Sequence, residues 1–382
     1  MPSPQTLRHT VYYAANSVVI QSLAILLLDP KEYGRFSAFY LLLALAYSIQ
    51  LSAICEPWLR AGGKPDSGPD YSTLLVVLSC LISFACLLWV VVGRLGPSYF
   101  CISLAIGLST YRQGARYAAV IQRRPSKTGP GDFWGLVVAL GAFLLARMIV
   151  RLTTISSLGL AWLLGAACAV LLSTAPNLRW KGALQRWIGE HSHDIERLLA
   201  DSAVLDFGTI LFPLMFGAFV GPSSFGVYRA LGSAAVLVRW VLNPLRPLIG
   251  RREQAFYRGR KVLIGSVIAA AVLGGLTAAG LRFILPIALP PSSVLSLLGE
   301  QYSAAVAVYV GANFLETVFY MTNRVYLSGS LLVRTRFLLT TITVTGPVVG
   351  WIFWGVDGAV WGAAASMVGG SVVNAAAQRR AH

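Results

Sequence analysis

The chain has 382 residues, of which 56% are hydrophobic and only 12% are charged, and its formal net charge is +16. A soluble domain usually carries about 25% charged residues, and a water-soluble core cannot hide this much apolar surface. The composition therefore excludes an ordinary soluble protein and indicates a protein embedded in a membrane.

Uncharged apolar stretches recur along the whole chain. Residues 71–93, 152–178 and 358–378 contain no Asp, Glu, Lys or Arg, and each is long enough to cross about 30 Å of hydrocarbon as a helix. The first apolar stretch lacks an Ala-x-Ala-like cleavage site and is followed by more spans, so it is predicted to be a membrane helix and not a signal peptide. We predict an all-α polytopic membrane protein with about 12 transmembrane helices. The expected helices are 11–28, 36–57, 71–93, 97–121, 132–150, 155–175, 202–220, 225–248, 262–285, 299–324, 334–353 and 357–377.

Lysine and arginine are distributed unevenly between the connections. With the N-terminus inside, about nineteen lie in the termini and even-numbered connections and about six in the odd-numbered ones, which is the positive-inside pattern. Both termini are therefore expected in the cytoplasm. Arginine far outnumbers lysine, and alanine and glycine are abundant, which is typical of a high-GC bacterial source, so we expect a bacterial inner (plasma) membrane. The basic clusters predict contact with anionic phospholipids at the cytoplasmic face, and no nucleic-acid partner is expected. The densest cluster is Arg251, Arg252, Arg258, Arg260 and Lys261.

The longest connection, about 176–200, is too short for a soluble domain. In it Trp187, Ile188 and Ile195 recur at helical spacing among charged residues, as an interfacial helix requires. His191 and His193 are two residues apart, so they point to different sides of a helix, and no metal site is expected. The predicted organisation is a six-helix lobe over 1–178, a cytoplasmic linker helix over 179–200, and a second six-helix lobe over 201–382.

A turn motif occurs twice, about half the chain apart. Asp29-Pro30-x-x-Tyr33-Gly34-x-Phe36 follows the first span and Gly221-Pro222-x-x-Phe225-Gly226-x-Tyr228 follows the seventh. A second echo pairs Arg116-Tyr117 in the fourth span with Arg324-Val325-Tyr326 in the tenth. Two pseudo-repeated six-helix lobes in the same orientation predict parallel repeats with a substrate pathway between them, as in an alternating-access transporter.

Several short motifs resemble a known family. The repeated Pro-x-x-aromatic-Gly turn, Glu56-Pro57-Trp58-Leu59-Arg60, Tyr228-Arg229-Ala230 and Asn243-Pro244-Leu245-Arg246-Pro247 are similar to those of bacterial polysaccharide-repeat-unit flippases. These belong to the multidrug/oligosaccharidyl-lipid/polysaccharide exporter superfamily. The resemblance implies a V-shaped pair of six-helix bundles that moves a polyprenyl-diphosphate-linked saccharide from the cytoplasmic to the outer leaflet. This chain is shorter than many members, and its first span carries no arginine, because Arg8 precedes it.

Arginines within the predicted spans are the candidate substrate ligands, because intramembrane charges normally face a cavity or a partner. Arg239, Asn243 and Arg246 share one helix face, as do Arg112 and Arg116. Our hypothesis is that they line a cationic cavity that attracts an anionic lipid-linked glycan, since guanidinium groups hold a diphosphate bidentately. The alternative is that the arginines near the cytoplasmic ends extend to lipid headgroups; these are Arg112, Arg116, Arg246 and Arg324.

Two acidic residues and several turn residues complete the candidate set. Glu316 belongs to a polar stripe in span ten and Asp206 lies early in span seven; they serve either in internal salt bridges or in coupling to H⁺ or Na⁺. No other cofactor is expected. The candidate turn or gating residues are Pro30, Gly34, Pro222, Gly226, Pro244 and Pro247.

Three other functions compete with lipid-linked glycan export. An enzyme is not expected, because the four histidines flank the membrane and there is no paired-carboxylate motif, phosphate-binding glycine loop or metal cluster. A cationic drug exporter of the same superfamily is disfavoured by the excess of intramembrane arginine. The third is a membrane subunit of an envelope-polysaccharide complex that does not itself transport, and other polysaccharide-assembly proteins are expected partners of either an exporter or such a subunit.

Overall fold

The fold was analysed in a computed structural model, which describes residues 19–61, 67–122, 129–172, 176–235, 238, 242, 259–288, 290–327 and 329–380. Within these ranges the chain is helical and contains no strand. Seven of the described helices are long and apolar enough to span a membrane. The chain divides into two compact units, one of residues 1–24 and 36–211 and the other of residues 25–35 and 212–382.

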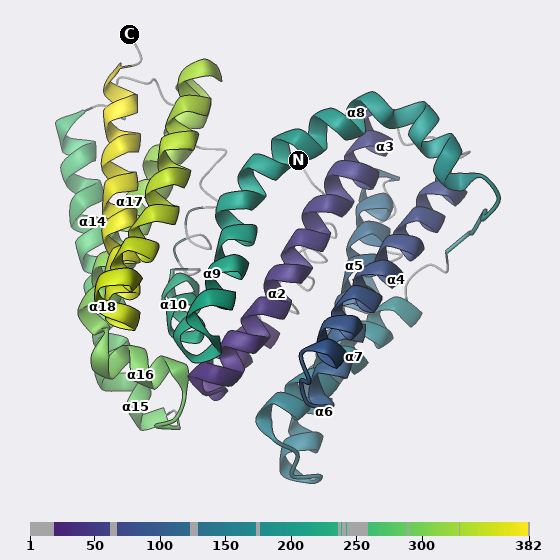
Figure 1. The fold of residues 1–382 in the computed structure, drawn as a ribbon, viewed down its shortest axis with the longest axis horizontal. Helices are drawn as coiled ribbons and strands as arrows, with labels where there is room; N and C mark the ends of the chain where they lie inside the picture. Colours follow the sequence, from purple (N-terminus) through teal and green to yellow (C-terminus); the bar gives the residue numbers. More distant parts are fainter. Residues whose placement is uncertain are drawn as a thin grey trace. The chain divides into compact units, whose positions relative to one another are not determined.

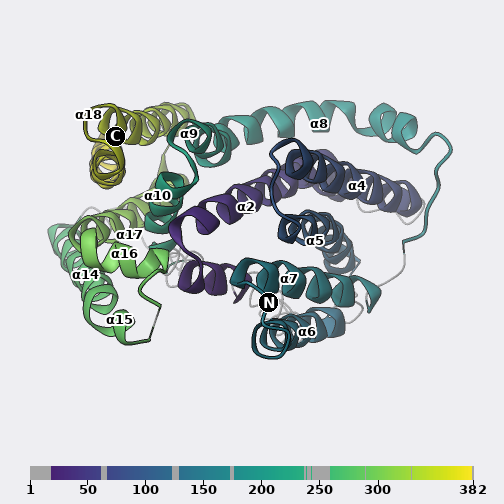
Figure 2. The same ribbon diagram turned by 60° about the horizontal axis from the view of Figure 1, so that its bottom comes forward.

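Unit 1 is a bundle of long apolar helices. Helices α4, α5 and α7 pack side by side, and α6 packs against α7 (Figures 1 and 2). Aromatic residues hold α2 to this bundle, because Phe39 stacks with Trp89 and with Tyr99 at centroid separations of 4.5 and 5.4 Å. The bounds are α2 (Pro30–Gln50), π-helical η1 (Leu51–Cys55), α3 (Glu56–Arg60), α4 (Gly68–Val92), α5 (Ser98–Ile121), α6 (Gly129–Met148), α7 (Thr154–Leu171), α8 (Ala183–Asp206) and π-helical η4 (Phe207–Leu211).

Unit 2 places α17 between α14 and α18 (Figure 1). Close helix approach depends on small residues there: a Cβ on Gly274 would lie 2.3 Å from the Ala307 carbonyl oxygen. The first turn of α2 also belongs to this unit. The bounds are α9 (Phe212–Val220), α10 (Pro222–Ala234), α14 (Arg260–Ala279), π-helical η6 (Gly280–Ile284), α15 (Leu285–Ala288), α16 (Val294–Gln301), α17 (Ser303–Tyr326) and α18 (Gly329–Arg380).

Helix α18 is two antiparallel spans, as the sequence predicts. Non-helical backbone at Trp354 and Gly355 separates them, and Gly355 has a φ of 60°, which favours glycine. Glycines then allow the two arms to touch, since a Cβ on Gly350 would lie 1.9 Å from the Gly358 carbonyl oxygen. The predicted break between 353 and 357 is therefore confirmed.

The observed helices follow most of the expected spans, and the predicted all-α polytopic fold is confirmed. Three boundaries differ. Helix α8 continues without a break through η4 into α9, whereas the sequence predicts a separate linker helix ending at residue 200. The backbone stays helical across this point because Phe207 keeps right-handed helical dihedral angles, and the π-helical turn η4 shifts the helical phase without ending the helix. Helix α10 ends at Ala234, inside the expected span 225–248, and the expected span 299–324 is divided at Tyr302 between α16 and α17. The predicted first span lies mostly outside the described residues, as does the second half of span eight.

Candidate functional site

The most buried charges in unit 1 form a cluster between α5 and the first turn of α6. The Arg112 side chain is 7% exposed and donates two hydrogen bonds to Asp132 Oδ1, one from Nε at 2.8 Å and one from Nη2. Arg116, one turn further along α5, places its Nε 3.7 Å from Asp132 Oδ2 and is 15% exposed. Two guanidinium groups therefore share one carboxylate that is itself 2% exposed. The cluster carries one net positive charge.

A second polar group lies in unit 1, close to the middle of α5. Gln50 is completely buried, and its Nε2 donates to the Thr110 carbonyl oxygen at 2.7 Å. Its Oε1 has no partner among the described residues. The Tyr71 hydroxyl donates to the carbonyl oxygen of Gly114 at 2.8 Å, one turn along α5. The backbone of α5 is thus held from two sides by buried polar side chains.

The polar stripe of α17 faces α18 within unit 2. Asn323 Nδ2 donates to the Asn374 carbonyl oxygen at 2.8 Å, and Asn313 Nδ2 lies 3.7 Å from Met367 Sδ. Arg336 donates to the Tyr320 hydroxyl at 2.5 Å and stands 5.1 Å from the Tyr320 ring centroid. Some buried polar atoms of this seam have no partner among the described residues: Asn313 Oδ1, Asn323 Oδ1, Asn374 Nδ2 and Gln378 Nε2. Such atoms are costly in an apolar bundle and suggest water or a ligand there.

A tyrosine fixes the turn between the two arms of α18. The Tyr302 hydroxyl, at the start of α17, donates to Asp357 Oδ1 at 2.5 Å. Burial and this hydrogen bond raise the pKa of Tyr302 well above its ordinary value. Tyr302 therefore remains a protonated donor throughout the physiological pH range.

The repeated turn motif forms a symmetric helix crossing in unit 2. Helices α2 and α10 begin at Pro30 and Pro222. A Cβ on Gly34 would lie 1.8 Å from the Pro222 carbonyl oxygen, and one on Gly226 would lie 1.8 Å from the Pro30 carbonyl oxygen. The two motifs thus pack against each other through equivalent atoms. Only glycine at both positions allows this approach.

Helix α8 is fastened along unit 1 by polar contacts. Arg186 donates two hydrogen bonds to Asp70, at 2.9 and 2.6 Å, and Arg60 pairs with Asp194 at 3.0 Å. Trp187 Nε1 donates to the Ala53 carbonyl oxygen at 3.0 Å. Leu184 and Ile188 on another side of the helix are exposed, as expected of a helix lying in a membrane interface.

The structure locates part of the predicted site. Arg112 and Arg116 come together around Asp132, and Pro30, Gly34, Pro222 and Gly226 form the helix crossing. Asp206 is half-buried at the end of α8, and no described Lys or Arg lies within ion-pair distance of it. Glu316 is half-buried on α17 and lies against α18 near Gly370. Arg239, Asn243, Pro244, Arg246 and Pro247 lie outside the described residues.

The sequence did not reveal that Asp132 is the acidic partner of Arg112 and Arg116. In the sequence, Asp132 is the first residue of the expected span 132–150 and directly follows a basic connection. Its buried pairing with Arg112 depends on the packing of α5 and α6 against α7, which one sequence does not reveal. A signal was nevertheless present, because an acid beside the membrane interface close in sequence to two intramembrane arginines is a natural counter-ion.

These features define a multi-pass membrane protein built from two helical units. No family model matches the sequence, and no curated protein matches it either. Solved structures do match its fold.

An inward-facing multidrug resistance MATE family transporter of the MOP superfamily is 11% identical, with a TM-score of 0.61 over 98% of this chain and 97% of that one. The lipid II flippase MurJ in an inward closed conformation is 9% identical, with a TM-score of 0.61 over 95% of this chain and 86% of that one. The eukaryotic MATE transporter AtDTX14 is 12% identical, with a TM-score of 0.56 over 98% and 95%. This chain therefore has the two-lobe fold shared by these transporters and this flippase, none of which is an enzyme by its description.

Proposed function

We propose that this protein is an alternating-access transporter that exports an anionic lipid-linked saccharide across the bacterial inner membrane. The observation that carries the proposal is the fold, which matches a multidrug transporter and a lipid flippase over nearly the whole chain. Parallel repeats of this kind place a substrate between two lobes and expose it alternately to either side. The short family motifs in the sequence support the narrower choice of a polysaccharide-repeat-unit flippase.

The charge of the α5–α6 cluster supports an anionic substrate. Arg112 is almost completely buried and is paired with Asp132. We therefore expect it to contribute to the local electrostatic field and not to contact the substrate directly. Arg116 is the more exposed of the two and lies further from the carboxylate, which makes it the better candidate to contact a diphosphate. In a medium of low dielectric the field of this cluster acts over a longer range than it would in water.

Coupling to H⁺ or Na⁺ would use the two candidate acids, Asp206 and Glu316. Asp206 has no described cationic partner, and Glu316 faces a seam with unpaired amide atoms. The absence of a described cation beside Asp206 favours an exchangeable ion at that residue over a closed salt bridge. We expect Asp206→Asn or Glu316→Gln to make export insensitive to the corresponding ion gradient, whereas Asp194→Asn on α8 should leave that sensitivity unchanged.

Export of cationic drugs is the second candidate function. It is favoured by the descriptions of two of the matching structures, which are MATE transporters, one of them a multidrug resistance protein. A net positive cluster within the bundle would repel a cationic drug. The two functions therefore predict opposite responses when that positive charge is removed.

An export assay separates the candidates. Deleting the gene should cause lipid-linked oligosaccharide to accumulate on the cytoplasmic leaflet, and purified protein in vesicles should restore movement of that lipid to the other leaflet. Efflux of a cationic dye is measured in the same vesicles. Dye efflux without movement of the lipid-linked saccharide would reject the proposal in favour of a drug exporter.

Charge variants refine this experiment. Arg116→Gln and Arg239→Gln should abolish saccharide export while the protein still folds, and Arg116→Lys should restore part of the activity because it keeps the charge but not the bidentate geometry. Arg197→Gln removes an exposed cation on α8 and is the matched control. Normal export by Arg116→Gln and Arg239→Gln would remove both residues from the site.

A further inference from the structure

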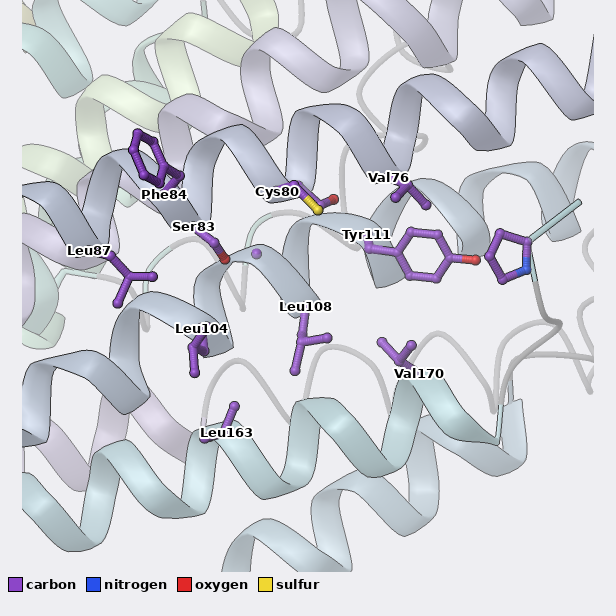
Figure 3. A pocket seen from close by; sticks show the side chains of 13 residues that line it. Val76, Cys80, Ser83, Phe84, Leu87, Leu104, Leu108, Tyr111, Leu163 and Val170 are labelled. Atoms are coloured by element: carbon purple, nitrogen blue, oxygen red, sulfur yellow. The ribbon is translucent and has the colours of Figure 1, made fainter. Parts of the chain in front are cut away.

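An apolar groove runs along unit 1 between α4, α5 and α7. Its volume is about 520 Å³. Cys80 and Phe84 on α4, Leu104 and Leu108 on α5, and Leu163 on α7 line it, and Figure 3 shows their side chains around the same space. Phe84 is 64% exposed and Cys80 is also exposed, so the groove is open along the surface of the unit.

The two serine hydroxyls in the lining of the groove are both hydrogen-bonded to the backbone. The Ser79 hydroxyl donates to the Leu75 carbonyl oxygen at 2.7 Å, and the Ser83 hydroxyl donates to the Ser103 carbonyl oxygen at 3.2 Å. Gly107 brings α5 close to α4, since a Cβ there would lie 2.0 Å from Ser83 Oγ. Because both hydroxyls are satisfied by the backbone, the groove suits an apolar occupant.

The groove lies on the face of α5 that points away from α2. The Thr110 carbonyl oxygen accepts a hydrogen bond from Gln50, and the Tyr99 ring stacks on Phe39. Gln50 and Phe39 both belong to α2. Leu104 and Leu108 lie on the other side of α5 by the helical period of 3.6 residues. An open apolar groove at membrane depth is therefore in contact with hydrocarbon.

The length of the groove fits one leaflet. It extends along α4 from Leu87 to Val76, which is about 16 Å at the helical rise of 1.5 Å per residue. The hydrocarbon core of a bilayer is about 30 Å thick. The groove thus covers about half of the membrane, which is the depth that one acyl chain reaches.

Cations and an aromatic ring follow the cytoplasmic end of the groove. Tyr111 and Pro176 line the groove at that end. Arg179, three residues later, is exposed, and its backbone N–H donates to Thr73 Oγ1 at 2.9 Å, which holds the segment against α4. Trp180 and Lys181 are also exposed. Tryptophan marks the membrane interface, and two adjacent cations attract an anionic headgroup.

We propose that this groove is a binding site for one anionic phospholipid of the cytoplasmic leaflet. One acyl chain lies between Phe84, Leu104 and Leu163, and the phosphate lies beside Arg179 and Lys181. The site is separate from the transported substrate and does not depend on what that substrate is. It ties α4, α5 and α7 to the membrane beside the start of α8.

Native mass spectrometry of the full chain in lipid nanodiscs tests the site. The nanodiscs contain phosphatidylcholine with or without phosphatidylglycerol. We expect one phosphatidylglycerol to remain bound to the wild type, and Leu104→Trp, which fills the groove, to lose it. Leu144→Trp on α6 changes an exposed leucine outside the groove and should retain it. Arg179→Gln should weaken retention about fivefold, the effect of about one surface cation, whereas Arg197→Gln should not.

Cys80 gives an independent readout, because it is exposed within the groove. Phosphatidylglycerol should slow alkylation of Cys80 in the wild type and in Leu144→Trp, and should have no effect in Leu104→Trp. Size-exclusion profiles establish that each variant is folded. Equal retention by Leu104→Trp and Leu144→Trp would overturn the site, as would equal retention of phosphatidylcholine and phosphatidylglycerol. Recovery of a prenyl diphosphate lipid in place of phospholipid from native membranes would overturn the assignment of the occupant.

Discussion

The symmetric crossing of α2 and α10 predicts a large effect of adding a single methyl group. In Gly34→Ala the new Cβ would lie 1.8 Å from the Pro222 carbonyl oxygen, whereas contacts under 3.0 Å essentially never occur. The opposing atom belongs to the backbone, so the two helices must move apart by about 1 Å. Overpacking of this kind costs about 1–3 kcal/mol. Because the opposing atom is part of the backbone and cannot rotate away, we expect a cost near the upper end of that range. Gly226→Ala meets the Pro30 carbonyl oxygen in the same way and should cost as much.

The same separation relieves both clashes, so the two substitutions should not be additive. The double variant should be destabilised by clearly less than the sum of the single variants, a coupling of about 1 kcal/mol or more. Thermal unfolding followed by tryptophan fluorescence in one detergent measures this. Gly265→Ala on α14 is the matched control, because nothing lies within 4 Å of its new Cβ and alanine is the better helix former by about 1 kcal/mol. Additive losses, or a wild-type melting temperature for Gly34→Ala, would refute the crossing.

Three further substitutions test the buried contacts by the same measurement. Asp132→Asn removes the carboxylate charge from the buried pair with Arg112 and should cost about 3–5 kcal/mol. Asp194→Asn breaks the exposed pair with Arg60, whose side chain is 45% exposed, and should cost about 0–1 kcal/mol. Equal losses would contradict the difference in burial between the two pairs. Trp187→Ala should cost about 3–5 kcal/mol by removing a buried ring, and Ile188→Ala, on the exposed side of α8, should stay within about 0.5 kcal/mol. Tyr302→Phe should cost about 1.5–3 kcal/mol by removing the hydrogen bond to Asp357. Because the pKa of Tyr302 is raised, that loss should be constant below the ordinary pKa of 10.0 and should shrink only at higher pH, where Tyr302 of the unfolded wild type ionises and the unfolded state becomes more favourable.

The spans were predictable because each rests on a local property. A run of uncharged apolar residues has to be helical in hydrocarbon, where every backbone polar group must be satisfied internally, and this fixed the helices from α4 to α7 within a few residues. The break in α18 was predictable for the same reason, since Gly355 and Asp357 interrupt the apolar run. The continuity of α8 with α9 was not, because composition alone does not tell a helix that ends from one that bends into the membrane.

The repeat shows where sequence reasoning stops. The matching positions of Pro30 and Pro222 and of Gly34 and Gly226 were visible, and they were interpreted as two separate turns that each start a helix. What one sequence did not reveal is that the two turns pack against each other. Glycine at both positions is explained by this contact, because neither has the positive φ that would otherwise call for glycine. An internal repeat therefore indicates two things here: that the sequence is duplicated, and that the two repeated turns pack against each other.

The α5–α6 cluster changes how intramembrane arginines should be weighed as evidence for an anionic substrate. Counting Arg112 and Arg116 as two free positive charges overstates the field, because Asp132 cancels one of them and engages the deeper guanidinium. The pairing of Arg112 with Asp132 also helps to position Arg116. A carboxylate held at 2% exposure fixes the position of the Arg112 guanidinium, and Arg112 and Asp132 together limit the positions open to Arg116. One positioned cation binds a diphosphate with less loss of conformational entropy than two mobile ones. The proposed preference for an anionic cargo thus depends on where the positive charge is held and not on the number of arginines.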